Sequence, residues 1–179
     1  MNKTGIIYGI NGPVIYLKGD SGFKISEMVY VGKDHLVGEV IGLKKGMTTI
    51  QVFEETTGLR PGETVIGTGD AISVLLGPGI IHNIFDGIQR PLEEIAKTSG
   101  KYISRGVSVD SLDTEKKWHT HITVKEGDVV GPGTVIAETQ ETASILHKSM
   151  VPPNIAEGTV IKAAPDGDYT ILEPIVTIE

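Results

Sequence analysis

The 179-residue chain contains no cysteine, and only 5% of its residues are aromatic. Without cysteine the chain has no disulfide, no thiolate metal site and no cysteine nucleophile. With so few aromatic residues, a packed core must consist mainly of Ile, Val and Leu. Basic residues are also outnumbered, and the net charge is −7 at pH 7. This charge argues against a nucleic-acid partner, because phosphate binding relies on clustered Lys and Arg.

Long apolar runs are missing as well. The longest run, around residues 72–76, is far shorter than the roughly 20 residues of a transmembrane helix. Glycines and Pro13 interrupt residues 1–20, where a signal peptide would have its apolar core. We therefore expect a cytoplasmic protein that reaches a membrane only through partner subunits. Its 23 glycines and nine prolines instead indicate many turns, as in a mainly β chain.

Residues 1–70 predict a small six-stranded β-barrel. The pair Asn11-Gly12 is typical of a hairpin turn, because both residues tolerate positive φ. Further on, Thr48, Ile50 and Val52 alternate with residues of the opposite face, as in a strand. Six short strands with tight turns favour a closed barrel, which has no exposed edges. The expected strands are residues 4–10, 13–18, 28–31, 35–43, 47–53 and 64–67.

Residues 71–109 predict a linker with one short helix. The sequence Gly77-Pro78-Gly79 excludes regular structure, whereas Pro91 suits the first turn of a helix. Leu92 and Ile95 follow at helical spacing, and Gly100 can end the helix.

Residues 110–179 predict a second β-rich module, inserted after the linker. Glycine- and proline-rich turns separate its β-type runs. Together these three regions give a mainly β fold: a barrel, a linker with one short helix, and a second β module. The expected strands after the helix are residues 102–107, 118–124, 133–138, 145–150, 158–163, 169–172 and 175–178.

Residues 73–92, SVLLGPGIIHNIFDGIQRPL, closely resemble the catalytic A subunit of V-type and A-type rotary ATPases. The resemblance includes GIIYGINGPV at 5–14 and TTGLRPGETVIGTG at 56–69. Residues 110–179 in turn resemble the insertion that is specific to that subunit. It implies the N-terminal region of a catalytic subunit that alternates with non-catalytic B subunits in a hexameric head. It also implies an insertion that can meet the peripheral stalk. The parent enzyme would couple ATP hydrolysis or synthesis to proton or sodium transport.

The phosphate-binding loop that such an ATPase needs is not found in residues 1–179. That loop has the form G-x-x-x-x-G-K-[ST]. Lys33 is followed by Asp34, and Lys101 is followed by Tyr102, so neither Gly-Lys pair fits. We therefore expect a non-catalytic fragment without catalytic, cofactor-binding or metal-binding residues, whose full-length parent binds ATP and Mg.

Three linker residues are the candidates for an interface. Phe85, Asp86 and Arg90 lie where, in the resembling family, the barrel, the helix and a neighbouring subunit could meet. The alternative is that Phe85 fills a core between modules while Asp86 and Arg90 bond locally.

Other polar residues give weaker patterns. His119 and His121 share a face if residues 118–124 form a strand, which suits a metal ion. Because no third ligand is evident, two solvent-facing histidines are favoured and no metal site is predicted. Likewise, the acidic residues Asp110, Asp113 and Glu115 predict a charged, solvated loop.

A second resemblance gives the alternative function. Residues 124–138 and 151–161 are similar to the sandwich of lipoyl and biotinyl carrier domains, which present a modified lysine at a hairpin tip. Lys148 is the nearest lysine, but the motifs Asp-Lys-Ala and Met-Lys-Met are both missing. A stand-alone binding or carrier module would therefore have Lys148 as its attachment point.

Overall fold

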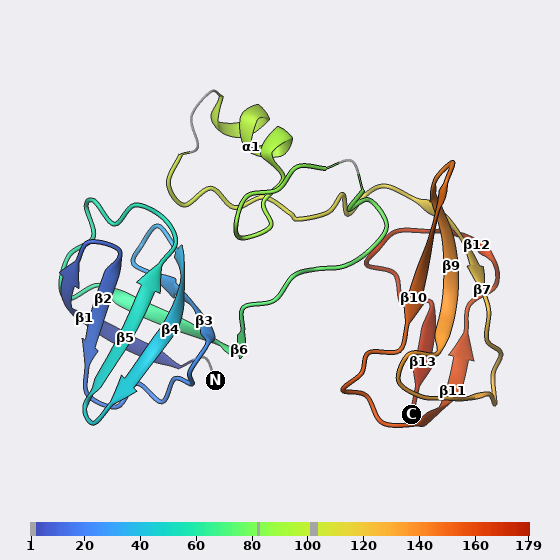
Figure 1. Ribbon diagram of the computed structural model, residues 1–179, viewed down its shortest axis with the longest axis horizontal. Helices are drawn as coiled ribbons and strands as arrows, with labels where there is room; N and C mark the ends of the chain where they lie inside the picture. The colour runs from blue at the N-terminus through green and yellow to red at the C-terminus, as the bar shows by residue number, and fades with distance from the viewer. Residues whose placement is uncertain (1–2, 82, 101–103) are drawn as a thin grey trace. The chain divides into compact units, whose positions relative to one another are not determined.

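The computed structural model describes residues 3–81, 83–100 and 104–179, which form two compact units. One unit combines residues 1–74 with 93–109, and the other combines 75–92 with 110–179. Both units are built mainly from β-strands, and one short helix lies in the middle of the chain (Figure 1). Within the described residues, no helix is long and apolar enough to cross a membrane.

The first six strands close into an antiparallel barrel in the order β1-β2-β5-β4-β3-β6 (Figure 1). Strand β1 pairs with β2 on one side and with β6 on the other, so every strand of the barrel has two neighbours. The barrel predicted from the sequence is therefore confirmed. Its strands are β1 (Thr4–Asn11), β2 (Val14–Lys18), β3 (Glu27–Val31), β4 (Leu36–Lys44), β5 (Met47–Val52) and β6 (Thr64–Ala71).

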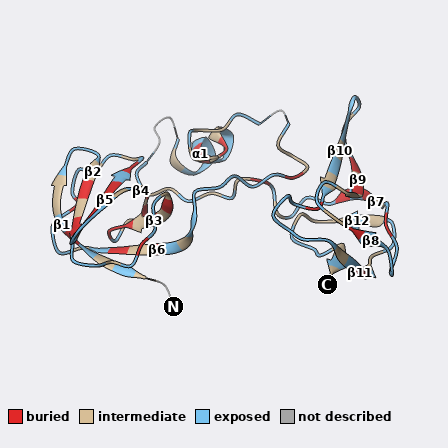
Figure 2. Ribbon diagram, turned by 60° about the horizontal axis from the view of Figure 1, so that its bottom comes forward, coloured by how far each residue is buried: buried red, intermediate tan, exposed pale blue. Residues whose placement is uncertain are grey.

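Buried residues lie on the strands of the barrel (Figure 2), and the buried hydrophobic cluster they form is aliphatic apart from Phe23. Burying one such side chain contributes about 1.5–3 kcal/mol to folding, so this core accounts for much of the stability of the unit. The fully buried members are Ile15, Val29, Val31, Leu36, Val40, Ile50 and Val65.

The predicted helix is confirmed as α1 (Leu92–Ser99). Pro91 immediately precedes it and forms an isolated bridge with Phe85. Gly100 ends the helix: its φ of +74° suits glycine, and its N–H donates to the carbonyl of Ala96 at 2.9 Å.

The second module contains a four-stranded sheet, β10-β9-β7-β12, and a three-stranded sheet, β13-β11-β8. Its main apolar cluster contains Val124, Val130, Val151 and Val160. The strands are β7 (Trp118–Ile122), β8 (Val129–Val130), β9 (Val135–Thr142), β10 (Ile145–Met150), β11 (Gly158–Ala163), β12 (Gly167–Tyr169) and β13 (Val176–Ile178).

Several predicted strands differ from these. The strand predicted at 169–172 is wrong: β12 ends at Tyr169, and the carboxylate of Glu173 closes a turn by accepting the N–H of Thr170 at 2.7 Å. The strand predicted at 133–138 starts later and runs on to Thr142, because β9 pairs with β10 along its length. Strand β8 was missed. Of the strand predicted at 102–107, residues 102 and 103 lie outside the described residues, and 104–107 are not in a strand.

One buried carboxylate ties β3 to β6. The side chain of Glu27, in a residue only 1% exposed, accepts the N–H groups of Lys24 at 2.8 Å and Gly69 at 3.0 Å. We expect Glu27→Ala to lower the free energy of unfolding by about 1.5–3 kcal/mol, because hydrogen bonds to a charged group contribute about that much to stability. Denaturant unfolding measures the change, and the exposed Glu55→Ala serves as the control. Equal midpoints for the two variants would contradict this role.

Candidate functional site

The segment that contains the predicted interface residues folds as a tight turn around Asp86. One carboxylate oxygen, Oδ1, accepts the N–H groups of Ile88 at 3.0 Å and Arg90 at 2.9 Å. The other, Oδ2, accepts the Nε–H of Arg90 at 2.7 Å, and both side chains are largely shielded from solvent. One carboxylate therefore fixes the turn that leads into α1.

Two opposing effects set the pKa of Asp86. Partial burial raises it, but hydrogen bonds from the backbone and side chain of Arg90 and from the N–H of Ile88, together with the positive charge of Arg90, outweigh burial. The pKa of Asp86 is therefore held below its usual value, and the carboxylate stays ionised at neutral pH.

The same turn is joined to residue 75 through Gln89. This residue has a φ of +62°, and its side-chain amide forms two hydrogen bonds of 2.6 Å with the backbone of Leu75. Phe85, only partly exposed, pairs with Pro91. Asp86 and Arg90 thus bond locally, as the alternative expected. An interface role for these residues stays a prediction.

Sequence reasoning missed the residue that anchors the preceding loop to the second module. Glu141, on β9, has a side chain only 3% exposed, and its Oε1 accepts the N–H groups of Gly79 at 2.8 Å and Ile81 at 2.9 Å. The partners are about 60 residues apart in the chain, so no local pattern indicates them. Glu141 holds residues 79–81 against the end of the four-stranded sheet.

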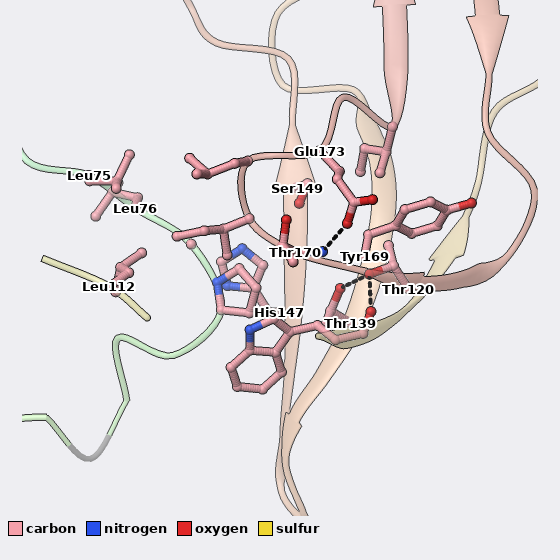
Figure 3. Close-up of a pocket in the computed structure, with 16 residues that line it drawn as sticks. Leu75, Leu76, Leu112, Thr120, Thr139, His147, Ser149, Tyr169, Thr170 and Glu173 are labelled. Carbon is pink, nitrogen blue, oxygen red and sulfur yellow. Dashed lines mark hydrogen bonds between the residues drawn. The ribbon is translucent and has the colours of Figure 1, made fainter. Parts of the chain in front are cut away.

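A pocket of about 200 Å³ lies between the loop at 75–78 and one face of the four-stranded sheet (Figure 3). The hydroxyl groups of Thr120 and Thr139 share a hydrogen bond of 3.0 Å in its wall. The indole N–H of Trp118 is buried and has no hydrogen-bond partner among the described residues. Other lining residues include Leu75, Leu76, Leu112, His147, Ser149, Tyr169, Ile171 and Glu173.

The imidazole of His147, which lines this pocket, is not hydrogen-bonded to its neighbour Glu141. The Nδ1 of His147 is 3.7 Å from Oε2 of Glu141, too far for a hydrogen bond. The other carboxylate oxygen of Glu141, Oε1, accepts the backbone N–H groups of the loop, so this side chain has a structural role. No group of three or more metal-ligating side chains that could hold an ion occurs in the part of the chain that the structure describes.

The remaining candidates lie elsewhere in the second module. Lys148 sits within β10, and its Nζ is 3.4 Å from Oε1 of Glu138 on the neighbouring strand. The tip of this hairpin is at residues 143–144, so Lys148 lacks the position of a carrier lysine. Asp113 accepts the N–H groups of Glu115 and Lys116, both at 2.9 Å, which orders part of the predicted acidic loop.

The two histidines of β7 point to solvent, each beside an aspartate. The Nδ1 of His119 is 2.8 Å from Asp168, and that of His121 is 2.6 Å from Asp166. A hydrogen bond from the backbone N–H of Ile122, with one from His121, holds the pKa of Asp166 below its usual value.

Comparison with protein-family models matches both units. Residues 7–69 match the beta-barrel domain of the ATP synthase alpha/beta family, and residues 109–179 match the ATP synthase alpha/beta subunit barrel-sandwich domain. The chain therefore belongs to the ATP synthase alpha/beta family.

Individual relatives indicate which subunit of this family the chain resembles. The chain is 50% identical over all 179 residues to a V-type ATP synthase alpha chain of Halothermothrix orenii, and 51% identical over 176 residues to alpha chain 2 of Clostridium tetani. It is 50% identical over 175 residues to the A subunit of the A-type ATP synthase of Methanopyrus kandleri. The chain corresponds to the N-terminal region of the A subunit, or alpha chain, of V-type and A-type ATP synthases, which confirms the resemblance inferred from its sequence.

The chain covers only part of these relatives. It accounts for 30% of the length of the first two proteins and 29% of the third, while 98–100% of the chain itself is matched.

The turn around Asp86 should open in acid. Because the pKa of Asp86 lies below its value of about 3.9 in the unfolded chain, its stabilisation is fully present above about pH 4 and is lost as the pH falls through the folded pKa. Hydrogen exchange should show protection of the Ile88 and Arg90 amides that decreases below about pH 4.

The matched variant is Asp86→Asn. It should lower this protection at neutral pH and remove its dependence on acid, whereas the exposed Asp110→Asn should leave both unchanged. Protection in Asp86→Asn equal to that of the unmodified chain would show that the carboxylate does not hold the turn.

Proposed function

We propose that this chain is the N-terminal assembly region of the catalytic A subunit of a V/A-type ATPase. The parent enzyme couples ATP hydrolysis or synthesis to the transport of protons or sodium ions across a membrane. The observation that carries the proposal is the 50% sequence identity to A subunits and alpha chains along the whole chain. This identity spans both a β-barrel domain and a barrel-sandwich domain. The complex is peripheral to the membrane, and this region inserts no part of itself.

The barrel is proposed to form a ring with the barrels of alternating B subunits in a hexameric head. Two features support this role. Its interior is packed, so its contribution must come from its outer surface. That surface carries large apolar side chains that are at least 40% exposed: Ile6, Tyr8, Ile41, Leu43 and Phe53.

The rest of the chain is proposed to connect this ring to other parts of the enzyme. Residues 71–109 lead towards the nucleotide-binding domain, with Phe85, Asp86 and Arg90 at an interface. Residues 110–179 form the outward insertion that contacts the peripheral stalk. Two carboxylates support this role, because Asp86 and Glu141 each hold part of the linker in a fixed conformation. A segment that connects two modules mechanically needs such fixed points.

ATP and Mg are proposed to bind the parent protein outside residues 1–179, because no G-x-x-x-x-G-K-[ST] motif occurs within them. Calorimetric titration of the folded chain with MgATP should therefore show no saturable heat. Micromolar binding that depends on magnesium would contradict this division between assembly and catalysis.

The assembly role predicts a surface-specific defect. Ile6 and Tyr8 are two residues apart on β1, and both are more than half exposed. The double variant Ile6→Ser/Tyr8→Ser should weaken co-purification of the chain with a B subunit without lowering its melting temperature, because neither side chain belongs to the barrel core.

A matched control removes exposed apolar side chains from the second module. Val129→Ser/Ile161→Ser, also at positions more than half exposed, should leave B-subunit binding unchanged. Undiminished binding by the β1 variant, or an equal loss in the control, would count against docking through the barrel.

A further inference from the structure

The outer face of the four-stranded sheet carries two histidine–aspartate pairs side by side. On β7, His119 and His121 alternate with Trp118 and Thr120, which are buried on the opposite face. The two histidine side chains are 77% and 62% exposed. Because alternate strand residues share a face, both imidazoles project from one side of the sheet.

Each imidazole is oriented by a carboxylate from β12 or from the residue just before it. The Nδ1 of His119 is 2.8 Å from Oδ1 of Asp168, its direct partner in the strand register. The Nδ1 of His121 is 2.6 Å from Oδ2 of Asp166. Asp166 is itself held, because its Oδ1 accepts the backbone N–H of Ile122 at 2.8 Å.

These bonds select a tautomer. A neutral imidazole that donates Nδ1–H to a carboxylate keeps its lone pair on Nε2. Histidines that ligate metal ions are oriented in this way, with the second ring nitrogen bonded to a carboxylate. Here both Nε2 atoms belong to neighbouring exposed rings. The two residues lie roughly 6.7 Å apart along the strand, so inclined rings can approach a common ion.

We propose that His119 and His121 form a surface site for a divalent transition-metal ion such as Zn²⁺, bound through the two Nε2 atoms. Asp168 and Asp166 are positioning residues that orient the rings. With the two aspartates bonded to Nδ1, the protein supplies two ligands, and water fills the remaining coordination positions. The site is therefore open and exchangeable, unlike a closed structural zinc site.

This proposal is independent of the assembly role. The sequence alone favours two solvent-facing histidines, because no third ligand is evident in it. The supporting carboxylates lie 45 and 49 residues away along the chain, and only the pairing of β7 with β12 brings them to the histidines. Glu138, directly opposite His121 on β9, adds a further negative charge to this face, although its carboxylate is paired with Lys148.

The first test is a titration of residues 1–179 with ZnCl₂ alone, followed by calorimetry and by NMR of the histidine rings. We expect one equivalent of Zn²⁺ to bind and to shift the ring signals of His119 and His121, but not those of His35 or His147. His119→Gln and His121→Gln should each abolish saturable binding, while His147→Gln should leave it unchanged. No saturable binding by the unmodified chain, or binding retained in His119→Gln/His121→Gln, would overturn the site.

A second pair of variants tests the orientation of the rings. Asp168→Asn and Asp166→Asn keep all metal ligands, and removing such a supporting carboxylate should weaken Zn²⁺ binding about 10–100-fold. The exposed Asp110→Asn is the matched control. Zn²⁺ affinity that is unchanged in both aspartate variants would overturn the positioning role. The melting temperature of each variant shows whether a loss reflects unfolding.

Discussion

Carboxylates that accept backbone N–H groups hold the irregular parts of this protein in place. Outside strands and helices, a buried N–H group needs another partner, and losing it costs as much as a lost hydrogen bond. In this chain acidic side chains supply many of these partners. The net charge of −7 is therefore partly structural, because it includes the groups that fix the turns. Among the described residues, two such bonds each are accepted, for example, by Glu27, Glu63, Asp86, Asp113 and Glu141.

The strands also need partners for their backbone groups, and the two units differ in how they deal with the edges of their sheets. In the barrel, pairing of β1 with β6 gives every strand two neighbours, and no edge is left for unwanted association. In the second module, β10 and β12 lie at the two ends of the four-stranded sheet. Both carry charged side chains, Lys148 on β10 and Asp168 on β12, and charge is a common means of protecting such edges.

The limits of sequence reasoning follow from how far apart the interacting residues are. The barrel strands and α1 were predictable because their causes are local: Asn11-Gly12 makes a turn, Thr48 to Val52 alternate, and Gly100 ends the helix. Strand β8 has only two residues and leaves no periodic pattern. The contacts of Glu141 with the loop, and of Asp168 with His119, join residues 49 or more positions apart. No turn rule or hydrophobic period indicates such pairs.

Several polar groups near the linker and the pocket are engaged in structural hydrogen bonds, which leaves the exposed surfaces as the places where this chain can bind partners. Glu141 lies near His147, yet one of its oxygens holds the loop and the other is 3.7 Å from the imidazole. Asp86 and Arg90 neutralise each other within one turn. The two histidines of β7 differ from these groups. Their aspartate partners are bonded to Nδ1, and both side chains are more than half exposed, so the second ring nitrogens are the atoms proposed to bind.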